Sequence, residues 1–185
     1  LWAGLLSGSY PRLLEDYPLV NDPGGGFNYS NLSSNWLGII LARACECDLR
    51  EYAQRHLLDA MAIEAGDWGT DAEGHRNGCG NLHLRPRDMA KLGRLYLDGG
   101  WWGGEQVVPA AWVEASLQNY SPDAWMAQPP ADRIGVWFRD LGYGYQWWSA
   151  TVGGRRVDYA AGHGGQLIVL VHELDMVIVT SSNPF

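Results

Sequence analysis

The sequence predicts one α+β domain, because helical patterns fill its first part and strand patterns its last part, without regular alternation between the two. Its 185 residues are 46% hydrophobic and 18% charged, which is typical of a globular protein that buries a core. We expect a mainly helical region over residues 1–141 and the strands of an antiparallel sheet over residues 142–185, which together form one domain.

A turn and an apolar helix are predicted in the region of residues 21–43. The run Asn21-Asp22-Pro23-Gly24-Gly25-Gly26 is a strong turn signal, since glycine permits positive φ. The i, i+4, i+7, i+8 spacing of Leu32, Trp36, Ile39 and Ile40 predicts a mostly buried helix over residues 32–43. Its apolar face would stay exposed unless another segment or chain covers it.

Three further helices are predicted, with a polar, glycine-rich surface loop at Gly66–Asn81 between the first and the second. Each has a start signal, either a capping aspartate or a proline in the first turn. The predicted helices run from Asp48 to Leu58, from Pro86 to the Gly99-Gly100 stop, and from Pro109 to Leu117, and residues 119–141 are predicted to be irregular.

Strand patterns begin after Gly142, where apolar residues alternate or form short continuous runs. Short connections between such strands are typical of antiparallel pairs. The predicted strands are Tyr143–Ser149, Arg156–Ala161, Gln166–His172 and Met176–Thr180, and Glu173-Leu174-Asp175 joins the last two.

Charge and composition argue against several partners. The chain carries 21 acidic and 13 basic side chains, so it would repel a nucleic acid backbone or an anionic lipid surface. No apolar run approaches the roughly 20 residues that a membrane span needs. The first methionine is Met61, so we expect a fragment or cleaved product whose export signal would lie upstream, and these residues do not predict the compartment.

No metal or cofactor site is predicted. The spacing of Cys45 and Cys47 fits neither a disulfide nor a zinc knuckle, and with Cys79 these residues are expected to be structural thiols. The histidines form no HExxH motif and no pair at helical spacing.

Two short segments carry residues suited to catalysis. In Tyr29-Ser30-Asn31, Ser30 or Asn31 can cap the following helix while Tyr29 packs beside it, or the segment can belong to an active site. The run Gly162-His163-Gly164-Gly165-Gln166 interrupts the sheet pattern with small residues, as expected where a backbone approaches a ligand closely. A plain bulge or turn explains this second run equally well.

These segments, the run NLHLRPRDMAKLGRLYLDGG at 81–100 and the run YGYQWW at 143–148 occur in an order that resembles the serine β-lactamase-like hydrolases. That superfamily includes class C β-lactamases, penicillin-binding DD-peptidases, esterases and 6-aminohexanoate-oligomer hydrolases. The likeness covers nearly all 185 residues, and the GHGGQ and NLHLRPRDMAKLG segments are most similar to the esterase and aminohexanoate-hydrolase branch. It implies a β-lactamase/transpeptidase-like fold with strands of the antiparallel sheet packed against helices.

One motif of the family is missing. The family uses Ser-x-x-Lys for nucleophile and base, a Tyr-x-Asn segment, and a Lys-Thr-Gly type strand. Lys91 is the sole lysine, and Asp88 stands three residues before it, so the chain contains no Ser-x-x-Lys. The resemblance therefore implies a domain that is incomplete at its N-terminus, with the motif supplied by a missing N-terminal segment or by a second chain.

The resemblance also implies roles for the motif residues. Tyr29 would exchange protons with the nucleophile and the leaving group, and Asn31 would bind the substrate carbonyl and the catalytic lysine. His163 takes the first position of the Lys-Thr-Gly type motif, Gly164 and Gly165 follow, and the Gln166 N–H would form half of an oxyanion hole. A tyrosine, whose pKa is ordinarily about 10, acts as a base only beside a cation, which the absent lysine would provide.

The predicted function is therefore hydrolysis of a small-molecule ester or amide through an acyl-enzyme, with the 185 residues alone inactive. With His163-Gly164 in place of Lys-Thr, the chain lacks a permanent cation for a substrate carboxylate, so strong β-lactamase activity is not expected. The alternative is a non-catalytic relative or binding module that keeps the fold. By resemblance the protein would be periplasmic or secreted, with a cytoplasmic location as the alternative.

Tryptophan pairs at residues 101–102 and 147–148 invite the idea of an aromatic pocket. Large rings are more often core or interface residues. We expect only one ring of each pair to face a ligand.

Overall fold

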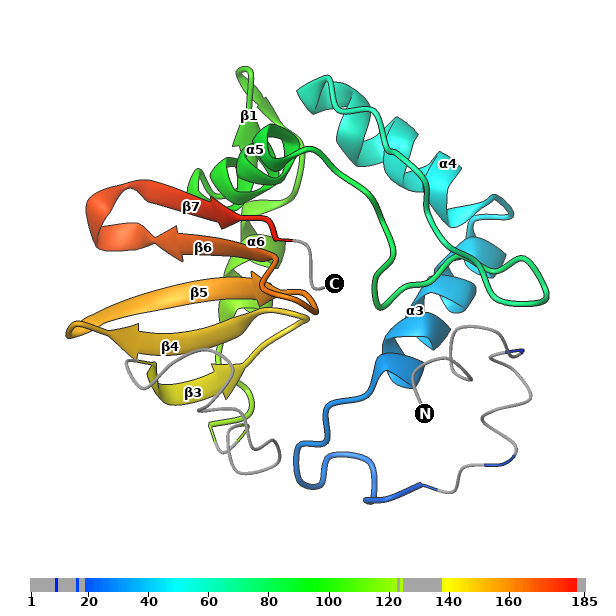
Figure 1. The fold of residues 1–185 in the computed structure, drawn as a ribbon, viewed down its shortest axis with the longest axis horizontal. Coiled ribbons are helices and arrows are strands. Elements are labelled where there is room, and N and C mark those ends of the chain that lie inside the picture. The colour runs from blue at the N-terminus through cyan, green and yellow to red at the C-terminus, as the bar shows by residue number, and fades with distance from the viewer. Residues whose placement is uncertain (1–8, 10–15, 17–18, 123, 125–137, 183–185) are drawn as a thin grey trace. The chain divides into compact units, whose positions relative to one another are not determined.

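The computed structural model describes residues 9, 16, 19–122, 124 and 138–182. The chain forms an α+β structure with helices and an antiparallel sheet, which confirms the predicted fold class (Figure 1). It divides into two compact units, one of Leu1–Gly26 and Ser30–Leu84, the other of Phe27–Tyr29 and Arg85–Phe185. The predicted boundary at residue 141 stays a prediction.

In the first unit, helix α3 spans Asn31–Ala44. Ser30 is its N-cap and accepts a hydrogen bond from the Ser33 N–H at 3.1 Å, which confirms the capping alternative for Ser30. Burial differs from the prediction, because Leu37 and Ile40 are 57% and 55% exposed. The unit covers only the opposite side of the helix, where Gly38 lies against Leu49.

The second helical segment starts as predicted. The Asp48 side chain caps α4, Leu49–Ala53, by accepting hydrogen bonds from the Arg50 and Glu51 N–H groups. The helix continues through a π-helical turn at Gln54–Leu58 and a 3-10 turn at Asp59–Met61. The predicted surface loop then crosses α3 closely, since a Cβ on Gly78 would lie 2.2 Å from the Ser34 carbonyl oxygen.

The helices of the second unit also match their predicted positions. They are α5, Pro86–Leu97, which begins with a proline and is followed by Gly99 and Gly100 at positive φ, and α6, Ala110–Leu117, with Pro109 as N-cap. Between them lies a small hairpin that the sequence pattern did not predict, β1 at Trp101–Trp102 and β2 at Glu105–Gln106.

The sheet of the second unit has five antiparallel strands in sequence order. They are β3 (Arg139–Tyr143), β4 (Trp148–Val152), β5 (Arg155–Ala161), β6 (Leu167–Val171) and β7 (Met176–Thr180). The last three confirm the prediction, and a 3-10 turn at His172–Leu174 joins β6 to β7.

The prediction of one strand at Tyr143–Ser149 was wrong, because a turn separates β3 from β4 within it. The Gly144 N–H donates to the Trp147 carbonyl at 2.8 Å, and Gln146 takes a positive φ of 68°. The region predicted to be irregular includes residues 123 and 125–137, which lie outside the described residues; β3 begins near its end.

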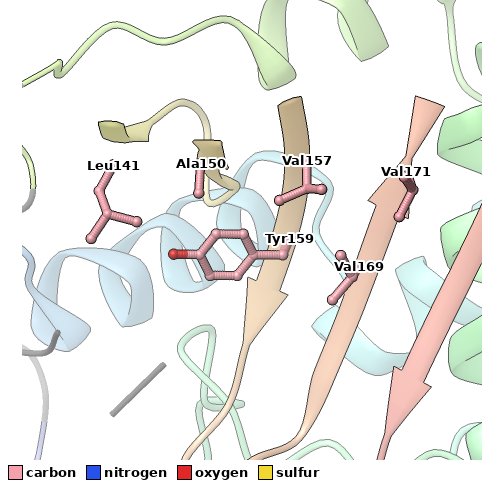
Figure 2. Close-up of a cluster of buried hydrophobic side chains, with 6 residues drawn as sticks. All are labelled: Leu141, Ala150, Val157, Tyr159, Val169 and Val171. Atoms are coloured by element: carbon pink, nitrogen blue, oxygen red, sulfur yellow. The ribbon is translucent and has the colours of Figure 1, made fainter. Parts of the chain in front are cut away.

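The two faces of this sheet pack differently. One face carries a cluster of buried side chains from β3 to β6 (Figure 2), whose members are Leu141, Ala150, Val157, Tyr159, Val169 and Val171. On the other face α5 packs against β6 and β7. The approach is close at Gly93, where a Cβ would lie 2.5 Å from Val177 Cγ1 and 2.8 Å from Ile168 Cγ2.

Candidate active site

The turn at residues 162–166 joins β5 to β6 and contains four of the predicted site residues. It is closed by the Gly162 N–H, which donates to the Gln166 carbonyl at 2.8 Å. Gly164 and Gly165 both take positive φ, at 81° and 90°, a conformation that glycine adopts without strain. His163 is exposed in this turn.

Hydroxyl groups after and within β7 hold the carbonyls of this turn. Thr180 Oγ1 donates to the Gly165 carbonyl at 2.6 Å, and Ser182 Oγ donates to the Gly164 carbonyl. The carbonyl and the following N–H of a trans peptide point in opposite directions. The Gln166 N–H therefore points away from Thr180, and its direction is fixed before any ligand arrives.

Tyr29 packs on the same sheet. Its ring stacks on Trp148 with the centroids 5.7 Å apart and an interplanar angle of 26°, and it meets Tyr143 edge-on at 6.1 Å. Trp148 also stacks on Tyr159 of the buried cluster, at 6.4 Å and 16°. The partly exposed Tyr29 ring is therefore fixed to the core through one tryptophan.

The strand registers put Tyr29 and the glycine turn at one end of the sheet. Trp148 pairs with Tyr159, which is two residues before the end of β5, and the 162–166 turn follows that strand end. The β3–β4 turn at residues 144–147 lies at this end too. We call it the glycine-turn end.

The aromatic side chains around Tyr29 form a partly dehydrated site. Phe27 contacts Tyr143 at 5.0 Å and Trp148 at 6.1 Å. Burial, and secondly the nearby Tyr29, raise the pKa of Tyr143 to about 12. Burial likewise raises the pKa of Tyr159. Charges that form in this cluster are therefore screened less than they would be in water.

Asn31, the last of the predicted site residues, is the first residue of α3 and belongs to the first unit, whereas Tyr29 belongs to the second. Its predicted role stays a prediction. Lys91 is on α5, where its Nζ lies 3.1 Å from Asp88 Oδ1 one turn away. The sole lysine thus pairs with the residue that stands where a Ser-x-x-Lys motif would have its serine.

The sequence pattern missed several residues of this site. Nothing in the sequence pattern pointed to Thr180 and Ser182, because their role depends on the pairing of β7 with β6. The tryptophan pair at 147–148 was noticed in the sequence: Trp148 faces Tyr29, whereas Trp147 contacts Tyr96 of α5 at 4.6 Å. For this pair the rings do face different surroundings.

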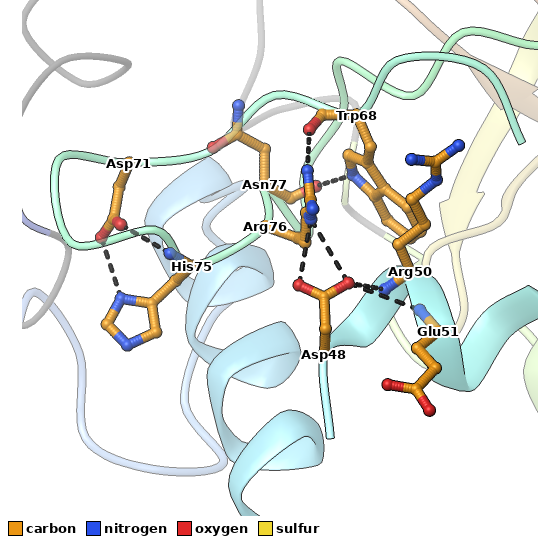
Figure 3. Close-up of polar contacts among 8 residues, drawn as sticks. All are labelled: Asp48, Arg50, Glu51, Trp68, Asp71, His75, Arg76 and Asn77. Atoms are coloured by element: carbon orange, nitrogen blue, oxygen red, sulfur yellow. Dashed lines mark hydrogen bonds and ion pairs between the residues drawn. The ribbon is translucent and has the colours of Figure 1, made fainter. Parts of the chain in front are cut away.

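One group of possible metal ligands occurs among the described residues, in the first unit: Asp71, Glu73 and His75, with ligand atoms within 4.8 Å of one another. Figure 3 shows two of them, Asp71 and His75. Asp71 Oδ1 accepts hydrogen bonds from the Glu73 and His75 N–H groups, and Asp71 Oδ2 lies 3.2 Å from His75 Nδ1. The Asp71 carboxylate thus stabilises the conformation of the loop to which it belongs. The prediction of no metal site stays a prediction.

Neighbouring contacts fix the same loop to α4. Arg76 Nε lies 3.1 Å from Asp48 Oδ2, and Arg76 also donates to the Trp68 carbonyl at 2.7 Å. The Trp68 indole in turn donates to the Asn77 carbonyl at 2.9 Å. These contacts give Arg76 and Trp68 structural roles in the loop.

Across the described residues, no helix combines the length and the hydropathy that a bilayer crossing would require.

Comparison with known proteins identifies the family. The Beta-lactamase family model matches residues 3–185. A 6-aminohexanoate-dimer hydrolase of Paenarthrobacter ureafaciens is 29% identical over 161 residues, which are 86% of this chain and 40% of that protein.

Solved structures show the same fold. A protein of Bacillus anthracis assigned as a 6-aminohexanoate-dimer hydrolase superposes with a TM-score of 0.77 at 23% identity, over 95% of this chain and 45% of its own. An octameric penicillin-binding protein homologue of Pyrococcus abyssi gives 0.61 at 20% identity, over 83% and 38%. The chain thus spans less than half the length of these relatives. It belongs to the Beta-lactamase family, in a β-lactamase/transpeptidase-like fold.

Proposed function

We propose that this chain is part of a serine hydrolase that cleaves an ester or an amide through an acyl-enzyme. One observation carries the proposal: Tyr29, stacked on Trp148, and the 162–166 turn share one end of the sheet. A phenol and a backbone N–H fixed in direction are two of the groups that acyl transfer requires.

Each group has a role in the proposed reaction. Tyr29 passes a proton between the serine nucleophile and the leaving group, and Asn31 binds the substrate carbonyl. The Gln166 N–H stabilises the oxyanion, which is supported by the hydrogen bond that turns the Gly165 carbonyl toward Thr180. His163 lies exposed within the same turn, and we assign it a contact with the leaving group or the rest of the substrate.

We assign the nucleophilic serine and its lysine to a polypeptide segment outside the 185 residues. Lys91 does not fill this role, because it pairs with Asp88 on α5. The matched relatives are more than twice as long as the part that this chain covers, so they have room for such a segment.

The exposed side of α3 supports the same assignment. Leu37 and Ile40 are 57% and 55% exposed, and we propose that the missing segment covers them. Residues 1–185 expressed alone should then aggregate, as measured by light scattering, and a stable monomer would contradict this cover.

The substrate we propose is neutral. His163-Gly164 replaces a permanently charged lysine and a hydroxyl, so the turn offers no fixed cation to a carboxylate. The names of two relatives refer to a dimer of 6-aminohexanoate, which favours an aliphatic amide or ester over a penicillin as the substrate of this protein.

A non-catalytic binding protein is the second candidate. It is favoured by one observation, the absence of Ser-x-x-Lys from the 185 residues. Such a protein would keep the fold and the rings around Tyr29 and would form no acyl-enzyme.

A covalent label separates the two candidates. The protein is expressed with all sequence that its gene encodes before Leu1 and is treated with a fluorophosphonate probe, and the labelled peptide is identified by mass spectrometry. The hydrolase requires labelling of a serine in a Ser-x-x-Lys motif outside the 185 residues, slowed by p-nitrophenyl butyrate, which is itself hydrolysed. Heat-denatured protein is the control. An unlabelled native protein without esterase activity would establish the binding protein instead.

A further inference from the structure

A second aromatic cluster lies on the surface of the same unit. Trp112, Tyr120 and Tyr145 are 52%, 47% and 45% exposed. The Tyr145 ring lies between the other two, stacked on Tyr120 at 4.9 Å and 14°, and tilted against Trp112 at 5.5 Å. We call these three side chains the aromatic surface. A role in the hydrophobic core does not explain why these aromatic residues gather here, since about half of each side chain remains in contact with solvent.

Backbone contacts hold the aromatic surface in place. The Tyr145 N–H donates to the Ser116 carbonyl at 2.9 Å, and the Tyr120 N–H donates to the Tyr143 carbonyl at 3.0 Å. Gly144 makes this approach possible, because a Cβ there would lie 2.3 Å from the Ser116 carbonyl oxygen. The turn at 144–147 is thus fixed against the end of α6, and the rings are preorganised without being buried.

The aromatic surface includes a residue of the turn at 144–147, which lies at the glycine-turn end as the candidate active site does. Tyr145 belongs to the turn between β3 and β4, and the residues that flank this turn, Tyr143 and Trp148, are the ones that contact Tyr29. A substrate whose reacting bond lies near Tyr29 can therefore extend along the turn to these rings.

The chemistry of the three rings limits what they can bind. They carry no formal charge, and the neighbouring Tyr145 hydroxyl raises the pKa of Tyr120. A sugar stacked on these rings would also need several hydrogen-bond partners for its hydroxyl groups, and the three side chains offer only two phenols and one indole N–H. A stable protein interface needs roughly 1,000 Å² or more, a larger area than three half-exposed rings offer. An extended chain of methylene groups needs only apolar ring surface.

We propose that Trp112, Tyr120 and Tyr145 bind the neutral aliphatic chain of the substrate beyond the bond that is cleaved. This inference rests on the proposed function, because it assigns the chain-length preference of that reaction to a named surface. Each methylene that leaves water on these rings improves binding up to about fourfold.

The test compares chain lengths in full-length protein. The ratio of kcat/KM for p-nitrophenyl octanoate to that for p-nitrophenyl acetate is measured in the wild type, Trp112→Ala and Tyr145→Ala. Trp101→Ala is the matched control, since Trp101 is 51% exposed and lies outside the cluster. We expect the ratio to fall at least fivefold in the first two variants and to stay unchanged in the control. An unchanged ratio in Trp112→Ala and Tyr145→Ala overturns the proposal.

A binding measurement keeps this outcome separate from the proposed function. If the wild type hydrolyses no ester, the hydrolase proposal fails, and the aromatic surface is tested with N-butylhexanamide, a neutral unreactive amide, by saturation-transfer NMR. Binding to the wild type and to Trp101→Ala, weakened at least fivefold in Trp112→Ala, supports the surface. Equal affinity in all three proteins, or no binding, overturns it. Circular dichroism shows whether each variant is folded. If Tyr145→Ala is unfolded, the result for Trp112→Ala alone decides the test.

Discussion

The two ends of the five-stranded sheet are stabilised by different interactions. At the end with the β4–β5 turn and the 172–174 turn, the contacts of the described residues include two ion pairs: Arg155 with Glu173 at 3.2 Å, and Arg94 of α5 with Asp175 at 2.7 Å. His172 Nε2, in the same region, lies 2.8 Å from Oδ2 of Asp158 in the middle of β5. At the glycine-turn end, the contacts include stacked rings and hydrogen bonds to backbone carbonyls from the Thr180 and Ser182 hydroxyls and from the Gln166 side-chain amide.

We expect the polar and charged contacts to stabilise the fold and the glycine-turn end to carry the proposed reaction. Asp158 is 2% exposed, and its carboxylate is compensated by His172 and by Arg156, which also donates to the Leu117 carbonyl. The glycine-turn end instead presents rings, backbone dipoles and the exposed imidazole of His163. This composition supports the neutral substrate that we propose.

The largest effect is expected at Tyr29. Tyr29→Phe keeps the ring stacked on Trp148 but removes the hydroxyl that the proposed mechanism uses to move protons. We expect kcat/KM for p-nitrophenyl butyrate, measured in full-length protein, to fall about 10²- to 10⁴-fold.

The matched control for this substitution is Ser30→Ala. It removes the cap of α3 and should lower the free energy of unfolding by about 1 kcal/mol with little effect on the rate. Equal rates in the wild type and Tyr29→Phe would exclude a proton-transfer role for the phenol.

The next largest effect is expected at Asp158, which lies in the middle of β5 and bonds His172 toward the opposite end. Asp158→Asn removes a buried charge that faces Arg156 and His172, so we expect the free energy of unfolding in urea to fall by about 1–3 kcal/mol. Catalytic rates of the folded protein should stay unchanged. Glu173→Gln is the control at the same end, and its exposed pair with Arg155 should contribute at most about 1 kcal/mol. If the free energy of unfolding fell more in Glu173→Gln than in Asp158→Asn, the larger stabilising role of the buried carboxylate would be refuted.

A smaller effect on the rate is expected from Thr180→Val. It removes the hydrogen bond that turns the Gly165 carbonyl, so the Gln166 N–H loses its fixed direction, and kcat should fall about fivefold. Thr151→Val, on β4, is the control and should leave kcat unchanged. If both variants kept the wild-type kcat, the oxyanion role of this turn would lose its support.

The smallest effect concerns alkaline pH. Because the pKa of Tyr143 is raised to about 12 in the folded protein from an ordinary value of 10, the folded state holds this proton more tightly than the unfolded state. Its stabilising contribution is present below pH 10 and is lost as the pH rises toward 12. In Tyr143→Phe, we expect the unfolding temperature to decline less steeply over this interval than in the wild type. Parallel declines would show that Tyr143 does not contribute.

Most elements could be predicted from the sequence where the signals were local. The Asp48 cap, the proline starts of α5 and α6, and the apolar run of β7 each gave the element within a few residues. The break between β3 and β4 could not be predicted, because Gln146 takes a positive φ that its residue type does not announce. That conformation accompanies the contact of the turn with Ser116.

The candidate site was predicted only in part, because some of its residues belong to local motifs and others come together only through tertiary contacts. The family order of motifs pointed to Tyr29 and to the turn at 162–166, but not to Thr180 or to the three rings of the aromatic surface. The functional roles of all these residues stay predictions until the variants are measured.

By itself, the sequence determined the fold class, the helix boundaries and the identity of the motif residues, because caps, glycines, prolines and apolar spacing act over one or two turns of chain. Only the tertiary structure decided that Tyr29 stacks on Trp148, that Gly144 meets Ser116, and that exposed rings gather beside the glycine-turn end. Those contacts join segments far apart in the chain. They form only when strand register and close backbone approach bring the segments together.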